Sequence, residues 1–244
     1  MAAKGGGSRR PAPRRPAAGA KKASPASKKT AQKKSSVRFD APSAPSEAPR
    51  SFLLGVVPGA TPGKWISAWR ERMPRVELVL VPLAVSAQSD ALAEGSVDAA
   101  LVRLPIDEAA LHIIRLYDEV PVAVVSAQSH LTAADELALS DLEGEVVIVP
   151  GDDVLAAAVP GAVVPAFAAP ADTGAAVETV AAGVGVVLLP MSLARLHARK
   201  DVETRPVRDA PISTVALAWP REATTPDVET FVGIVRGRTA HSSR

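Results

Sequence analysis

After a polar N-terminal stretch, apolar residues fall into short runs separated by amphipathic segments. The runs 51–57 and 76–82 consist mainly of Val, Leu and Phe, which is typical of strands buried on both faces. Between them, Trp65, Trp69 and Met73 recur every four residues, so their side chains lie on one face of a helix. The pattern therefore predicts a strand, a helix and a second strand.

The same alternation continues to the C-terminus. Further strands are expected at 97–103, 111–117, 119–126, 146–150, 161–168, 186–190, 202–207 and 212–220. Helices are expected at 62–73, 86–95, 172–185, 191–198 and 225–238, and a loop with one or two helical turns at 133–145. Apolar strands that alternate with helices predict an α/β fold with a mostly parallel sheet covered on both faces. About 190 residues suffice for two lobes of about 90 residues each.

The glycine-rich segment 55–65, GVVPGATPGKW, ends in Gly-Lys as phosphate-binding loops do. A P-loop requires glycine and a hydroxyl residue where this chain has Pro58 and Trp65. The spacing of a dinucleotide-binding loop is missing as well. A strand, a tight turn and a helix remain, with Thr61 as the predicted N-cap and Pro62 in the first helical position. Such a helix start either binds an anion, for example a carboxylate, or is simply capped.

Charge divides the chain into two unlike parts. Residues 1–50 contain 13 Lys or Arg and two Asp or Glu, for a net charge of +11. The remaining 194 residues contain 15 basic and 24 acidic residues, for a net charge of −9. Val37 and Phe39 are the only large apolar residues of the first part after Met1. This part cannot bury enough apolar surface to offset its chain entropy, so we predict a disordered basic tail.

The tail carries evenly spaced basic pairs that suit an extended polyanion such as DNA. Its candidate contact residues are Lys21, Lys22, Lys28, Lys29, Lys33 and Lys34. With no aromatic stacking platform and no folded reading element, the contact would be non-specific in sequence. The alternative is a solubilising, self-repelling spacer.

Several function classes find no support in the sequence. The chain has no cysteine, so disulfides, thiolate metal sites and cysteine nucleophiles are excluded. Its four histidines lack metal-ligand spacing, and no Gly-x-Ser-x-Gly elbow occurs. We therefore predict neither an enzyme nor a metal or cofactor site. The sequence also shows no secretory signal and no apolar stretch of about 18 residues, which predicts a cytoplasmic protein without a membrane span.

Four motifs occur in an order that is informative as a set. They are P-x-V-E-L, G-x-x-D-x-A-L-V-R, P-V-A-V-V…H-L…L-x-L-x-D-L and V-A-A-G-V-G-V-V-L-L-P. With them, the segment from about residue 51 to residue 235 resembles the effector-binding (substrate-binding) domain of LysR-type transcriptional regulators. The resemblance implies a two-lobed, type 2 periplasmic-binding-protein-like fold with two crossover strands and a small ligand between the lobes.

The implied boundaries follow from the positions of the crossovers, near PVAVVS and STVALAW. Lobe one is expected at 51–122 plus 214–238, lobe two at 123–213, and a disordered C-terminus at 239–244. Regulators of this family carry a helix-turn-helix before this domain, whereas the tail 1–50 lacks the apolar periodicity to form one. The family also pairs its effector domains, so a homodimer is plausible.

The resemblance places the ligand pocket on the loop after the first strand, the end of the third strand, the crossover and loops of the second lobe. By position these are Gly59, Ala60, Thr61, Arg103, Leu104, Gln128, Pro150, Gly151 and Thr173. In a body of net charge −9, an arginine at the end of a strand is well placed to bind a carboxylate in a bidentate manner. Alternatively, Arg103 pairs with Asp107, Glu108 or Asp118, and Thr173 serves as an N-cap.

Two functions are consistent with these observations. The first is a LysR-like domain that senses a carboxylate-bearing metabolite. This domain would act in transcription regulation, and the tail would contact DNA without sequence specificity. The second is a nucleoid-associated or adaptor protein whose basic tail binds DNA and whose cleft is vestigial.

Overall fold

The computed structural model describes residues 50–237. The predictions that concern residues 1–49 of the basic tail, its six lysines and the C-terminal residues 239–244 therefore lie outside the described residues. Arg50, the last residue of the predicted tail, instead begins the first strand and pairs with Asp227. Within the described part of the chain, no helix is long and apolar enough to cross a membrane.

Two mixed sheets form the framework of the molecule. The first has the strand order β2-β1-β3-β9-β4, and the second has the order β6-β7-β5-β8. In the first sheet the strands are β1 (Arg50–Val56), β2 (Val76–Pro82), β3 (Ala99–Arg103), β4 (Leu111–Glu119) and β9 (Ser213–Pro220). In the second they are β5 (Pro121–Ser126), β6 (Val147–Ile148), β7 (Val186–Pro190) and β8 (Val202–Pro206).

Five helices accompany the sheets in the described residues. They are α1 (Gly63–Arg72), α2 (Gln88–Ala93), α3 (Thr173–Ala181), α4 (Met191–Leu196) and α5 (Pro226–Val235). Short 3₁₀ turns lie at Val85–Ala87, His130–Ala133, Leu139–Leu142 and Arg221–Ala223. We call the first sheet with α1, α2 and α5 the first lobe, and the second sheet with α3 and α4 the second lobe.

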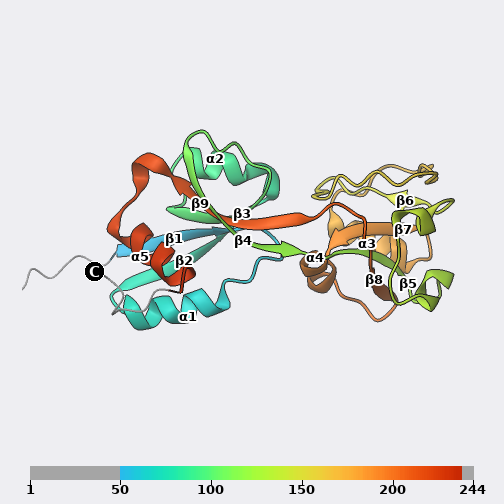
Figure 1. Ribbon diagram of the computed structural model, residues 1–244, viewed down its shortest axis with the longest axis horizontal. Coiled ribbons are helices and arrows are strands. Elements are labelled where there is room, and N and C mark those ends of the chain that lie inside the picture. Colours follow the sequence, from blue (N-terminus) through green and yellow to red (C-terminus); the bar gives the residue numbers. More distant parts are fainter. Residues whose placement is uncertain (1–49, 238–244) are drawn as a thin grey trace, which may run out of the picture. The chain divides into compact units, whose positions relative to one another are not determined.

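The chain passes between the lobes twice. Val120 connects β4 to β5, and residues 207–212 connect β8 to β9 (Figure 1). The boundary between the sheets therefore falls at Val120, so residues 121 and 122 belong to the second sheet. The second passage returns the chain to the middle of the first sheet, where β9 lies between β3 and β4.

Apolar side chains cover both faces of the first sheet. On one face, Phe52 from β1, Trp69 from α1 and Phe231 from α5 pack together with ring centroids 4.7 to 5.9 Å apart. On the other face, α2 contributes Leu92 to a cluster with Val102 of β3. The alternation of β-strand side chains explains how one continuous apolar run serves two clusters.

The structure corrects the prediction of mostly parallel sheets. Only β1–β2, β1–β3 and β6–β7 are parallel pairs, and the other four pairings of named strands in the described residues are antiparallel. All four antiparallel pairings involve β5 or β9, the strands that follow the two crossovers and run against their neighbours. An apolar run reports that a strand is buried and carries no information on its direction.

Two local predictions were also wrong. Residues 161–168 do not form a strand, since Val163 makes only an isolated bridge to Val146. Pro165 follows closely and has no N–H to continue a ladder. Helix α1 begins at Gly63 with Pro62 as its N-cap and no side-chain cap, so Thr61 does not serve as the predicted N-cap.

Candidate functional site

Arg103 ends strand β3 with only 2% of its surface exposed. Gln88 of α2 fixes its backbone from both sides: the Gln88 Nε2 donates to the Arg103 carbonyl at 2.8 Å, and the Arg103 N–H donates to Gln88 Oε1 at 2.9 Å. A buried guanidinium is stable only when acceptors surround it. The strand end and the helix therefore aim this side chain at a fixed point between the lobes.

The guanidinium connects four segments of the chain. Its Nη1 donates to Glu119, in an ion pair at the end of β4, and to Ser213 Oγ at 2.7 Å at the start of β9. Its Nη2 donates to the Pro58 carbonyl at 3.0 Å and to Ser192 Oγ of α4 at 3.1 Å. Arg103 thus contacts both crossovers, the loop after β1 and the second lobe.

One donor of this group lacks an acceptor. The Nε of Arg103 is buried and has no hydrogen-bond partner among the described residues. Buried polar groups are normally hydrogen-bonded, so an unsatisfied donor calls for a structural or functional explanation. Among the described residues, this is the buried side-chain donor that the protein itself leaves unsatisfied.

The loop after β1 lies directly against Arg103. Gly59 has a φ of +82°, in the left-handed region that favours glycine. A Cβ built on Gly59 would lie 3.2 Å from Arg103 Nη2 and 2.5 Å from Ser192 Oγ. Ala60 is buried in the core of the first lobe, and Thr61 is exposed. Of the predicted loop residues, Gly59 therefore lies next to the predicted arginine.

Tyr117 joins this cluster from strand β4, with its side chain partly exposed. Burial is the main cause that raises the pKa of its phenol above 10.0, and the charge of Glu119 raises it further, while Arg103 and the Thr61 backbone N–H oppose the shift. The raised pKa extends the range over which the hydroxyl is neutral to more alkaline pH.

This shift predicts a loss of stability at alkaline pH. Because the folded-state pKa of Tyr117 is raised, the unfolded chain loses its proton first as pH rises through 10. The contribution of the neutral phenol is complete below that pH and declines above it. The Tyr117→Phe variant should lose less stability than wild type between pH 9.5 and 11, measured by urea unfolding at each pH. Parallel curves for the two proteins would contradict the assignment.

Three predicted residues come together in the second lobe. Thr173, the first residue of α3, is buried and donates its hydroxyl to Asp152 Oδ1 at 2.9 Å. Gly151 donates its N–H to the Pro170 carbonyl at 2.9 Å, and Pro150 beside it is buried. The N-cap of α3 is Asp172, whose side chain accepts from the Ala175 N–H, so Thr173 does not have the N-cap role.

The two remaining predicted residues have different positions. Leu104 packs at the edge of the α2 face of the first lobe, and its N–H donates to the Thr214 carbonyl at 3.0 Å. Gln128 is exposed in the turn after β5. Since β5 starts at the crossover and rises about 3.3 Å per residue, Gln128 lies roughly 20 Å away from Val120. The structure therefore does not group Gln128 with the Arg103 cluster.

Sequence reasoning missed the residues that hold Arg103 in place. They include Glu119, Ser192, Ser213 and Gln88, which come from four elements far apart in the chain. No spacing or composition signal joins them, because they meet only through the strand order of the first sheet and the position of α4. One signal in the sequence was Glu119, the acidic residue just before the predicted crossover PVAVVS, which could have been considered as a partner of Arg103.

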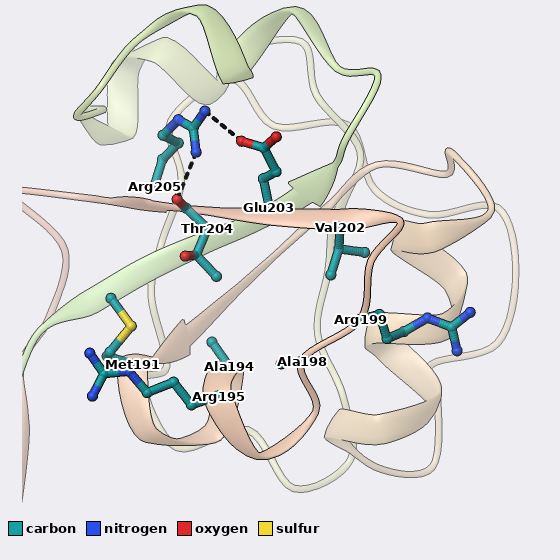
Figure 2. A pocket seen from close by; sticks show the side chains of 9 residues that line it. All are labelled: Met191, Ala194, Arg195, Ala198, Arg199, Val202, Glu203, Thr204 and Arg205. Atoms are coloured by element: carbon teal, nitrogen blue, oxygen red, sulfur yellow. Dashed lines mark hydrogen bonds and ion pairs between the residues drawn. The ribbon is translucent and has the colours of Figure 1, made fainter. Parts of the chain in front are cut away.

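Among the surface cavities, one of about 230 Å³ is lined by Glu119 and Val120. Four have volumes of about 230 to 720 Å³, and the nine predicted residues line none of these four. A cavity of about 470 Å³ between α4 and β8 is lined by several arginines (Figure 2). Its Arg205 pairs with Glu203 and donates to the Thr132 and Ala134 carbonyls, both at 2.7 Å. This guanidinium is thus engaged by acceptors of the protein itself.

Comparisons with known proteins show the family to which this chain belongs. Residues 54–240 match the model of the LysR substrate binding domain. HcaR, the Hca operon transcriptional activator of Escherichia coli K12, is 26% identical over 205 residues, which cover 78% of this chain and 69% of HcaR. The HTH-type transcriptional regulator CatR of Pseudomonas putida is 29% identical over 170 residues, which cover 66% of this chain and 58% of CatR.

Solved structures support the fold. The BenM effector-binding domain with its effector benzoate has a TM-score of 0.62 at 20% identity and covers 77% of this chain and 91% of its own. The reduced OxyR regulatory domain from Pseudomonas aeruginosa has a TM-score of 0.59 at 23% identity, with 77% and 95% covered. The predicted two-lobed, type 2 periplasmic-binding-protein-like fold is therefore confirmed.

Proposed function

Because the chain belongs to the family of LysR substrate-binding domains, we propose that it is an effector-binding domain that recognises a small carboxylate-bearing metabolite between its two lobes. The single observation that carries the anionic character is Arg103. It is a buried cation in a body of net charge −9, and its Nε–H has no acceptor among the described residues.

An effector oxygen would complete the set of acceptors around this guanidinium. A charge-assisted bond to a carboxylate is shorter and stronger than one to a neutral group. The first turn of α1 adds backbone N–H groups close by, and its N-cap residue Pro62 provides no side-chain acceptor for them. Gly59 and Thr61 would then line the first-lobe side of the site.

Access to this site requires the lobes to separate. Ser192 and Gly59 enclose Arg103 from opposite lobes in the structure. Two crossover segments, at Val120 and 207–212, form a hinge about which such a motion can occur. We infer that the effector enters an open form and that binding changes the angle between the lobes.

A role in transcription regulation extends this proposal. HcaR is described as a transcriptional activator and CatR as a transcriptional regulator, and the chain spans 69% and 58% of their lengths. In this proposal the lobe motion is passed to a DNA-binding partner or segment, in a protein that works in the cytoplasm. Pairing of two effector domains and non-specific DNA contact by residues 1–50 are further parts of it.

The test is a thermal-shift screen that compares acids with their neutral analogues. Benzoate and a series of aliphatic dicarboxylates are each paired with the corresponding amide. At a concentration 100 times its Kd, a bound acid stabilises the fold by about 2.7 kcal/mol. At about 2–4 °C per kcal/mol for a domain of this size, the melting temperature rises by roughly 5–10 °C. An equal shift with the amide, or no shift with any acid, would contradict a carboxylate effector.

A further inference from the structure

The contact between Gly59 and Ser192 joins the two lobes where neither position has spare room. A Cβ on Gly59 would lie 2.5 Å from Ser192 Oγ and 3.1 Å from Ser192 Cβ, both inside ordinary van der Waals contact. Ser192 Oγ also accepts the Arg103 Nη2 hydrogen bond at 3.1 Å. The contact thus combines close packing with a charge-assisted bond across the interlobe boundary.

The contact lies beside the hinge. Ser192 follows Met191, the first residue of α4, and the Met191 N–H donates to the carbonyl of Val120 at 2.9 Å. Val120 is the residue at which the chain first passes between the lobes. A small displacement at this point is enlarged at the far ends of the lobes, because packed elements move as rigid bodies.

We propose that Gly59, Ser192 and Arg103 form an interlobe latch that sets the angle between the lobes in the ligand-free protein. Glycine at 59 admits the serine hydroxyl, and the arginine then holds it. The latch belongs to the empty protein and requires no effector, so its test does not depend on the proposed function.

The test compares two alanine substitutions that strain the backbone equally. Gly59 and Gly95 both have positive φ, +82° and +67°, but no atom lies within 4 Å of a Cβ built on Gly95. Both substitutions place alanine in the left-handed region, while only Gly59→Ala introduces a clash with a side chain of the second lobe. The difference between the two variants therefore isolates the interlobe contact.

The readout is the distance between the lobes in the full chain. Because the chain has no native cysteine, Glu71→Cys on α1 and Glu178→Cys on α3 provide two specific spin-label sites, both exposed. Pulsed electron paramagnetic resonance should give a distribution for Gly59→Ala that is shifted by several ångströms or clearly broadened. Gly95→Ala should match the wild type.

A second-site change completes the design. Adding Ser192→Gly to Gly59→Ala removes the clashing side chain together with the hydroxyl that accepts from Arg103. It should therefore relieve the shift caused by the clash but leave a distribution broader than that of the wild type. Ser192→Val changes the latch from the second lobe and leaves Gly59 unchanged. This variant replaces Gly59→Ala in the test if Gly59→Ala does not fold. The proposal is overturned if Gly59→Ala and Gly95→Ala give the same distribution, or if Ser192→Val leaves the wild-type distribution unchanged.

Discussion

Replacing Arg103 with methionine is expected to lower the free energy of unfolding by about 3–5 kcal/mol. Methionine fills much of the same volume, so the loss comes from charge and hydrogen bonding. Glu119 is 7% exposed and would remain buried without its cation. Ser213 and the Pro58 carbonyl would lose their donor at the same time. Urea unfolding followed by circular dichroism measures the change.

Two comparisons make this expectation specific. Arg199→Met removes a guanidinium from an ion pair with Asp201 that is exposed to solvent on both sides, and it should leave the unfolding midpoint unchanged within error. Adding Glu119→Gln to Arg103→Met removes the uncompensated charge, so the double variant should be more stable than the single one. A double variant that is less stable than Arg103→Met would contradict a paired origin of the effect.

Ligand-binding experiments on Arg103 variants would report on two roles of this residue at once. The residue proposed to bind an effector is the one that fastens both crossovers and the loop after β1. A variant at this position would lose ligand binding and lobe geometry together. Ser192→Val separates the two better, because it changes the interlobe contact, retains the guanidinium and leaves the proposed first-lobe side of the site unchanged.

The sequence indicated Arg103 as a candidate ligand-binding residue but did not identify its ion-pair partner. Asp107, Glu108 and Asp118 were the expected acids, whereas the structure pairs Arg103 with Glu119. Asp118 instead accepts a hydrogen bond from Thr214 Oγ1 at 2.6 Å. Neighbouring strand residues point to opposite faces, and the register of β4 against β9 shifts between Arg115 and Tyr117. Such a bulge reverses which face each later side chain occupies, and a sequence pattern does not reveal it.

Much of the fold could be predicted because strands and helices depend on local pattern. The strands β2 and β7 begin and end at the expected residues. Strand direction and the position of Gln128 depend on how the chain returns between lobes, which is a long-range property. Likewise, the interlobe contact of Ser192 depends on where α4 meets the crossover. These features are set by tertiary packing and lie beyond hydrophobic periodicity.

The stability of the first lobe is expected to depend strongly on the aromatic ring of Phe231 in α5. Phe231→Ala should lower the free energy of unfolding by about 3–5 kcal/mol. Phe231 is fully buried, with its centroid 5.2 Å from that of Phe52 and 5.9 Å from that of Trp69. The chain closes its aromatic cluster with this residue, so its removal leaves a cavity under α5 that neighbouring alanine and valine side chains fill poorly.

A matched substitution is available on the surface. Phe167 is 40% exposed in the second lobe, and Phe167→Ala should change the free energy of unfolding by less than about 0.5 kcal/mol. Tryptophan fluorescence during urea unfolding reports on the cluster through Trp69, whose indole N–H donates to the Val76 carbonyl at 2.9 Å. If the two phenylalanine variants unfold at the same urea concentration, the aromatic cluster does not stabilise the first lobe as argued. A lower midpoint for Phe231→Ala alone would place that stability in the contact between α1, α5 and β1, the strand that leads directly into the loop at Gly59.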